Sequence, residues 1–150
     1  MINIIKMRPP RLAAVFLLFC WALHHFSPEK TIAHLPLPLL GTLAMFSGFA
    51  IMIRAWWFFK QMKTPICPTA TPQVLVTWGP FRFSRNPIYL GMLLMLMAST
   101  FFMGTLPAVF APLAFFVTID RFFIPYEERN LEQQFGQQYL NYTRDVRQWI

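Results

Sequence analysis

The sequence predicts an all-α integral membrane protein with about four transmembrane helices and C-terminal amphipathic helices. Hydrophobic residues make up 56% of the 150-residue chain and charged residues 13%, and the mean hydropathy is +0.44. Soluble domains carry about 25% charged residues, so this chain is poor in charge. Four apolar segments approach the length of about 20 residues that a helix needs to cross a bilayer. We therefore expect one membrane domain that comprises residues 1–150.

The four apolar segments are the expected transmembrane helices. Pro112 predicts a kink in the fourth, and Pro125 predicts its end, because proline lacks an N–H donor and clashes with the preceding turn. A short turn at Gly104 makes the third and fourth segments antiparallel neighbours. The expected elements are helices at residues 10–26, 37–59, 87–103 and 106–124, a loop at residues 60–86 and a helical cap at residues 126–150.

Basic residues gather at one end of these helices. Short loops rich in Lys and Arg stay in the cytoplasm, so we expect both termini and the 60–86 loop there, in a multi-pass protein of a bacterial inner membrane. No small-residue cleavage site follows Phe26, so the first helix is expected to be a retained anchor. Trp56–Phe59 then falls in the cytoplasmic aromatic belt. The basic residues are Lys6, Arg8, Arg11, Lys60, Lys63, Arg82, Arg85, Arg129, Arg144 and Arg147.

Two charged residues, Arg54 and Asp120, lie furthest inside the apolar segments, each about one turn from the cytoplasmic end. An ionisable residue inside the membrane is costly, and a partner of opposite sign lowers that cost. We therefore predict an Arg54–Asp120 ion pair. In the alternative, Arg54 extends to the interface, and Asp120 either pairs with the adjacent Arg121 or caps backbone groups locally.

The 60–86 loop changes character halfway. Its first half contains three prolines and should be irregular, whereas Val74–Thr77 is a β-branched run that could lie extended along a ligand or form a simple loop. Pro87 suits the first position of a helix, which puts Arg85 and Asn86 at a helix N-terminus. Unpaired N–H groups and arginines there should attract a carboxylate or phosphate. In the alternative, these arginines only fix topology near lipid phosphates.

The cap at residues 126–150 is amphipathic, with apolar residues at spacings of three and four. Gly136 should divide it into two helices. We expect the cap either to lie on the membrane surface or to fold back over residues 73–86. Its apolar stripe comprises Leu131, Phe135, Tyr139, Tyr142, Val146 and Trp149.

Metal and nucleic-acid chemistry find little support in the sequence. Cys20 and Cys67 are too far apart in sequence to form a metal motif, and His24, His25 and His34 lack the spacing of zinc ligands. We expect no metal site. The basic residues lie between long apolar runs, so they suit a bilayer better than a nucleic acid.

The two patches that carry polar chemistry should meet on the cytoplasmic side. One contains Arg85 and Asn86, and the other begins with Glu127 and Glu128. A ligand with both a carboxylate and a cationic group would match both patches. The amino-acid end of S-adenosylmethionine has these groups, with the carboxylate near Arg85 and the ammonium and sulfonium near Glu127.

Two sequence runs carry a family resemblance over residues 73–150. The run L-V-T-x-G-P-F-R-x-x-R-N-P-x-Y-L-G is followed by E-E-R-x-L-E-x-x-F-G-x-x-Y-x-x-Y-x-x-x-V-R-x-W. Together they resemble the membrane methyltransferases that include isoprenylcysteine carboxyl methyltransferases and phospholipid N-methyltransferases. The resemblance implies S-adenosylmethionine bound under the C-terminal segment and a lipophilic acceptor that enters from the bilayer.

The resemblance also implies which residues contact the cofactor. Asn86 stands where these enzymes usually have histidine, and Phe123 stands where eukaryotic carboxyl methyltransferases have arginine. The implied cofactor-binding residues are Gln73, Val74, Leu75, Val76, Phe81, Arg85, Asn86, Pro87, Ile88, Tyr89 and Glu127.

The sequence leaves the acceptor and the oligomeric state open. A carboxylate or thiolate acceptor needs no base, whereas an amine lipid does, and Glu127 and Glu128 are then the candidate bases. Two other functions remain open at this point. One is an NADPH-dependent membrane reductase similar to sterol and steroid reductases, and the other is a non-enzymatic assembly or lipid-binding protein.

Overall fold

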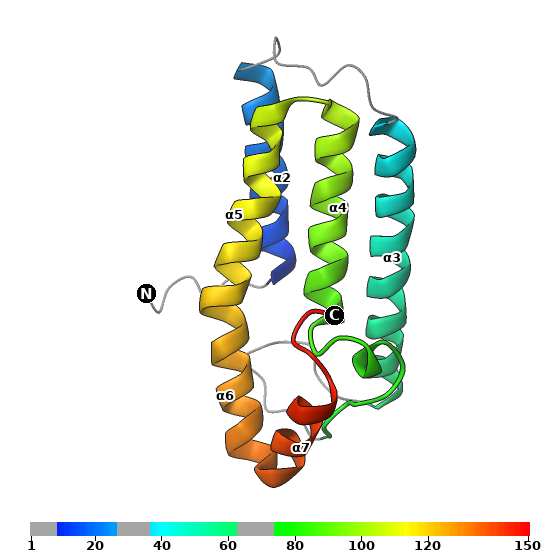
Figure 1. Cartoon of the computed structure of the whole chain (residues 1–150), viewed down its shortest axis with the longest axis vertical. Coiled ribbons are helices and arrows are strands. Elements are labelled where there is room, and N and C mark those ends of the chain that lie inside the picture. The colour runs from blue at the N-terminus through cyan, green and yellow to red at the C-terminus, as the bar shows by residue number, and fades with distance from the viewer. Residues whose placement is uncertain (1–8, 27–36, 63–73) are drawn as a thin grey trace.

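The computed structural model describes residues 9–26, 37–62 and 74–150, and this part of the chain is helical (Figure 1). Long helices run side by side, and the polar C-terminal segments lie at one end of the bundle. The helices are α2 (Pro9–Phe26), α3 (Leu37–Gln61), α4 (Pro87–Met103), α5 (Phe110–Thr118), α6 (Ile124–Phe135) and α7 (Gln137–Asp145). The short turns are the 3-10 helices η1 (Gly79–Arg82) and η2 (Leu106–Val109) and the π-helix η3 (Ile119–Phe123).

Two stretches of helix are long and apolar enough to cross a membrane by length and composition, residues 38–61 and 106–135. The helix α4 is also apolar but shorter. The first three predicted segments are confirmed as helices, with ends within two residues of the predicted ones. The loop residues 63–73 lie outside the described part of the chain.

The fourth segment does not end at Pro125 as predicted. It continues through α5, η3 and α6 to Phe135, far beyond the ends of its neighbours (Figure 1). In η3 the Ile124 N–H donates to the Ile119 carbonyl five residues earlier, which forms a wider π turn. Pro125 then lies in the first turn of α6, where its missing N–H costs little. Pro112 likewise lies in the first turn of α5 and needs no kink.

Close backbone contact joins α3 to α4. A Cβ on Gly48 would lie 2.7 Å from the Gly91 carbonyl oxygen, and a Cβ on Gly91 would lie 2.7 Å from the Gly48 oxygen. Small residues at helix crossings let membrane helices pack by van der Waals contact, since lipid offers no hydrophobic drive to associate. A buried cluster between α2, α4 and the long fourth helix supports the end of the bundle that carries the polar segments. It comprises Leu12, Tyr89, Met92, Leu96, Phe115, Ile119, Phe123 and Ile124.

The C-terminal cap folds back toward α4. Gly136 separates α6 from α7 as predicted, with a φ of 50° that suits glycine. Beyond α7 the chain returns to the N-terminus of α4, so residues far apart in sequence lie together (Figure 1). Of the two predicted positions for the cap, the structure shows the one over the segment before α4.

Candidate functional site

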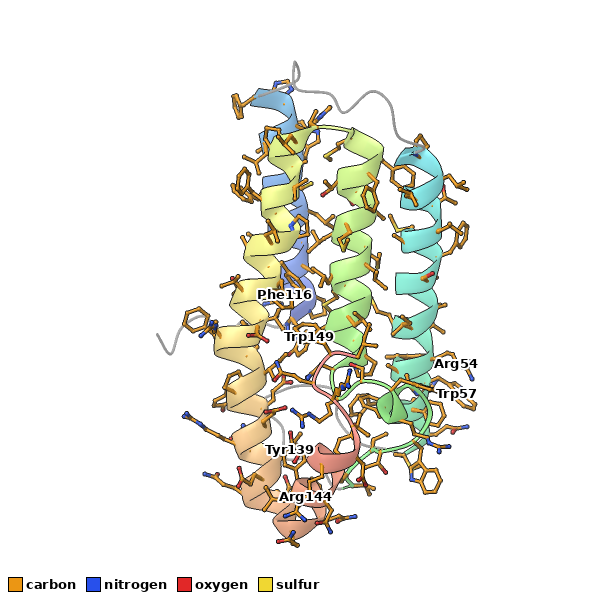
Figure 2. The ribbon with its side chains drawn as sticks, in the orientation of Figure 1. Arg54, Trp57, Phe116, Tyr139, Arg144 and Trp149 are labelled. Carbon is orange, nitrogen blue, oxygen red and sulfur yellow. The ribbon has the colours of Figure 1, made fainter. Side chains whose placement is uncertain are left out.

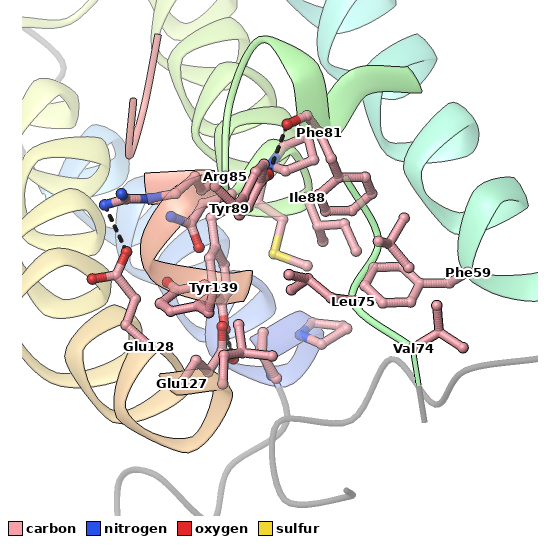
Figure 3. Close-up of a pocket in the computed structure, with 18 residues that line it drawn as sticks. Phe59, Val74, Leu75, Phe81, Arg85, Ile88, Tyr89, Glu127, Glu128 and Tyr139 are labelled. Carbon is pink, nitrogen blue, oxygen red and sulfur yellow. Dashed lines mark hydrogen bonds and ion pairs between the residues drawn. The ribbon is translucent and has the colours of Figure 1, made fainter. Parts of the chain in front are cut away.

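A cavity of about 460 Å³ lies where α4, α6, α7 and the segment before η1 meet (Figure 3). It has one polar wall, from α4, α6 and the residues before Pro87, and one apolar wall, from residues 74–81 and the end of α3. Its described lining residues are Pro9, Pro10, Phe59, Val74, Leu75, Val76, Phe81, Arg85, Asn86, Pro87, Ile88, Tyr89, Met92, Glu127, Glu128, Leu131, Tyr139 and Tyr142.

The polar wall contains a hydrogen-bonded acid. The Tyr89 hydroxyl in the first turn of α4 donates to Glu127 Oε1 in α6, at 2.5 Å. Glu127 lies beyond the apolar part of the long fourth helix. Burial raises the pKa of Glu127 to about 7, the Tyr89 hydrogen bond opposes this rise, and the nearby charge of Glu128 adds to it. Near neutral pH this carboxyl can therefore be charged or neutral, and a cation in the cavity would favour the charged form.

Arg85 supplies the positive charge in the same wall. Its Nη2 lies 2.8 Å from Glu128 Oε1 (Figure 3). Its Nη1 donates to the Thr143 carbonyl at 3.3 Å. The Arg85 Nε is buried and has no hydrogen-bond partner among the described residues. Burial, with the charge of Glu128, raises the pKa of Tyr139, which stays a neutral phenol. Arg85 is thus held in place but keeps an unused donor.

The opposite wall is apolar and aromatic. Leu75 and Val76 are buried in the segment before η1, and Phe81 packs edge to face on Phe59 of α3 with ring centroids 5.3 Å apart. Leu75 also packs against Tyr139 and Tyr142 of α7. The Val74–Val76 part of the predicted extended run has no regular structure and lies along the cavity.

The C-terminal strap, residues 146–150, is hydrogen-bonded to residues 84–86 of the polar wall. The Arg85 N–H donates to the Arg147 carbonyl at 3.0 Å, and Asn86 Nδ2 donates to the Gln148 carbonyl at 3.1 Å. The Ser84 hydroxyl donates to the same Gln148 carbonyl at 3.4 Å. Asn86 therefore ties the strap to the N-terminus of α4.

Asp120 in the π turn fixes the other end of the strap. Its Oδ1 accepts from Gln148 Nε2 at 2.7 Å and from Trp149 Nε1 at 3.0 Å. The Trp149 ring lies against Phe116, with centroids 5.0 Å apart (Figure 2).

The predicted Arg54–Asp120 pair is wrong. Arg54 is exposed on α3 and points away from the bundle (Figure 2), and it has no ion-pair partner among the described residues. The helix α4 lies between α3 and the long fourth helix (Figure 1). Equal depth in the membrane does not bring two helices together. The structure agrees better with the alternative that Asp120 pairs with Arg121, because Arg121 Nε lies 3.8 Å from Asp120 Oδ2.

The structure brings together every cofactor residue named from the sequence except Gln73, which lies outside the described residues. The candidate base Glu128 also lines the cavity. Sequence reasoning missed several lining residues, namely Pro9, Pro10, Phe59, Met92, Leu131, Tyr139 and Tyr142. The tyrosines stood out on the apolar stripe, whereas Pro9 and Pro10 carried no signal that could have placed them here. No group of three potential metal ligands occurs in the described part of the chain.

Comparison with known proteins points to one family. The model of the phospholipid methyltransferase family matches residues 37–138, more than half of the chain. An uncharacterized protein of Haemophilus influenzae is 38% identical over 63 residues, which cover 42% of this chain and 100% of that protein. No solved structure matches the chain.

Two Arabidopsis thaliana proteins are also similar. Protein-S-isoprenylcysteine O-methyltransferase A is 42% identical over 78 residues, and protein-S-isoprenylcysteine O-methyltransferase B is 40% identical over 78 residues. Each match covers 48% of this chain but only 36% of the Arabidopsis protein.

Proposed function

This chain belongs to the phospholipid methyltransferase family, and on that premise we propose that it is a membrane-embedded, S-adenosylmethionine-dependent methyltransferase. Its acceptor would be a small lipophilic molecule that bears a carboxylate, thiol or amine. We also propose that α2, α3, α4 and the α5 end of the fourth helix cross the bilayer, with both termini and the cavity on the cytoplasmic side. The basic residues gathered at that end support this orientation.

The observation that carries the proposal is the presence of opposite charges, Glu127 and Arg85, in the polar wall of one cavity. Glu127 would face the ammonium and sulfonium of the cofactor, while Arg85 and the N-terminus of α4 would face its carboxylate. Two features of the residues fit such a guest: the half-buried carboxyl of Glu127 has no ion-pair partner among the described residues, and the Arg85 Nε donor is unused there. The apolar wall at Leu75, Val76 and Phe81 would suit the adenine ring.

The cofactor would supply a methyl group already activated by the sulfonium. The chain's own residues then have to bind, orient and exclude water. Residues 74–81 and α7 cover the cavity with apolar and aromatic side chains. If the acceptor arrives protonated, Glu127 and Glu128 are the candidate bases, because both carboxyl groups line the cavity.

Titration of the purified protein with S-adenosylmethionine and with NADPH tests the proposal. We expect S-adenosylmethionine to bind and NADPH not to bind. Binding of NADPH alone would support a reductase, and binding of neither would support a non-enzymatic membrane protein. Either result would refute the methyltransferase.

A matched pair of variants tests the assigned cavity. Glu127→Gln removes the charge that faces the ligand's cation and should lower S-adenosylmethionine affinity at least tenfold, in line with the loss of a charge-assisted contact. Glu132→Gln makes the same change at an exposed position of the same helix. Equal affinity in the two variants would remove Glu127 from the site.

A further inference from the structure

A second surface, outside the cavity, combines positive charge with exposed aromatic rings. The sequence contains no Asp or Glu from Thr31 to Ile119, so the basic residues of α3 and η1 have no acidic neighbour along the chain. Arg85 is neutralised by Glu128 within the cavity. Lys60 and Arg82, by contrast, are exposed.

Four aromatic side chains accompany these two cations. Trp56 and Trp57 at the end of α3 are each 50% exposed, and Trp78 and Phe83 on either side of η1 are 63% and 77% exposed. Exposing these apolar rings to water is unfavourable in free energy, whereas aromatic rings commonly lie at the headgroup level of a bilayer. We call the set the interfacial patch: Trp56, Trp57, Lys60, Trp78, Arg82 and Phe83.

The fold holds the members of the interfacial patch together. The turn η1 packs against the end of α3 (Figure 1), so closely that a Cβ on Gly79 would clash with the Phe58 ring. Gly79 has a φ of 62°, which glycine adopts without strain. The Lys60 ammonium lies over the Trp56 ring, 5.1 Å from its centroid. Trp57 points outward from α3 on the side away from α4 (Figure 2).

We infer that the interfacial patch binds the headgroup phosphates of anionic phospholipids. Exposed cations accompanied by exposed aromatic rings, with no acidic residue near them in the sequence, are complementary to a negatively charged membrane surface. The rings would enter the headgroup region, and Lys60 and Arg82 would meet the phosphates. The partner is the lipid surface, because free phosphate would leave the aromatic rings exposed to water.

The interfacial patch connects to the cavity through η1. Phe81 on the inner side of η1 lines the cavity and packs on Phe59, and its carbonyl accepts a hydrogen bond from the Tyr142 hydroxyl at 2.7 Å. Lipid that holds the outer side of η1 would thus hold the apolar wall of the cavity. Anionic lipid should therefore raise the affinity of the cofactor, and this consequence rests on the proposed function.

Native mass spectrometry of the 150-residue chain can measure the lipid preference directly. The protein would be offered phosphatidylglycerol and phosphatidylcholine in competition, as wild type and as the Lys60→Gln/Arg82→Gln double variant. Each basic residue near a membrane contributes about 1 kcal/mol, so each loss should lower the preference for phosphatidylglycerol about fivefold, and both losses together more than tenfold. Inorganic phosphate should not compete.

The control is Arg144→Gln, which removes one charge from an exposed position on α7 beside Asp145, away from the interfacial patch (Figure 2). This variant should keep the lipid preference of the wild type. The assignment of the interfacial patch as a lipid site would be overturned if the wild type showed no preference for phosphatidylglycerol. It would also be overturned if Arg144→Gln lost as much of that preference as the double variant. Circular dichroism confirms that each variant is folded.

S-adenosylmethionine binding in nanodiscs with and without phosphatidylglycerol tests the connection to the cavity. We expect tighter binding with phosphatidylglycerol in the wild type and no difference in the double variant. Lipid preference without this change in affinity would refute the connection. Failure to bind S-adenosylmethionine in either lipid would refute the methyltransferase and leave the measured lipid preference as it stands.

Discussion

Replacement of Glu127 by Gln should make the protein more stable at alkaline pH. Folding raises the pKa of this carboxyl from an ordinary 4.5 to about 7, so the folded protein holds the proton more tightly than the unfolded chain. Stability therefore falls as the pH rises from about 4.5 to about 7 and is constant above that. The substituted amide would carry no charge, and its oxygen could still accept the Tyr89 hydrogen bond.

The size of the effect follows from the shift in pKa. At about 1.4 kcal/mol per pH unit, the shift corresponds to roughly 3 kcal/mol of destabilisation by the charged form at pH 8. At pH 5 the cost is less than about 1 kcal/mol, because the folded protein is almost fully protonated. Glu127→Gln should thus gain roughly 3 kcal/mol at pH 8 and little at pH 5.

Equilibrium unfolding in detergent, followed by the helical circular dichroism signal at both pH values, measures this difference. Glu132→Gln on the exposed side of α6 is the control and should change stability little at either pH. The same Glu127→Gln protein should bind S-adenosylmethionine more weakly, so that stability and binding move in opposite directions. A variant less stable than wild type at pH 8 would contradict this prediction and show that further contacts stabilise the Glu127 carboxylate in the folded protein.

Three further predictions concern the support of the cavity. Asp120→Ala removes the acceptor of two hydrogen bonds from the strap, so it should cost about 2 kcal/mol and make the C-terminus more sensitive to carboxypeptidase; unchanged digestion would contradict this. Gly79→Ala should cost more than about 1 kcal/mol, because it forces a Cβ into Phe58 at a positive φ, and an unfolding titration measures the cost. Tyr89→Phe removes the hydrogen bond that lowers the pKa of Glu127, so the pH midpoint of S-adenosylmethionine binding should move upward. A downward move would contradict the effect of Tyr89 on the pKa of Glu127.

Much of the architecture could be predicted because apolar segments of fixed length and proline or glycine punctuation are local signals. The boundaries of α4 and the break at Gly136 follow from such signals. The helix end predicted at Pro125 was wrong because the effect of this proline depends on the turn before it. The π turn at Ile119–Phe123 has no characteristic residue type that would reveal it in the sequence. The partner of Asp120 was missed because depth in a membrane says nothing about which helices are neighbours.

The candidate site was largely predictable for a different reason. Its residues come from two short runs that carry both charge and turn formers, so they stand out against an apolar chain. Pro9 and Pro10 reach the cavity only because α2 begins beside it, which no local pattern reveals. The strap contacts of Asn86 were equally hidden, since a backbone carbonyl such as that of Gln148 can belong to any residue.

A structure determined with bound S-adenosylhomocysteine would test the central claim most directly. We predict that its ammonium lies near Glu127, its carboxylate near Arg85 and its adenine against Leu75 and Phe81, all in the cavity between α4 and α6. Binding elsewhere on the protein, with this cavity unchanged, would contradict the claim that the two distant runs of sequence converge on one methyl donor.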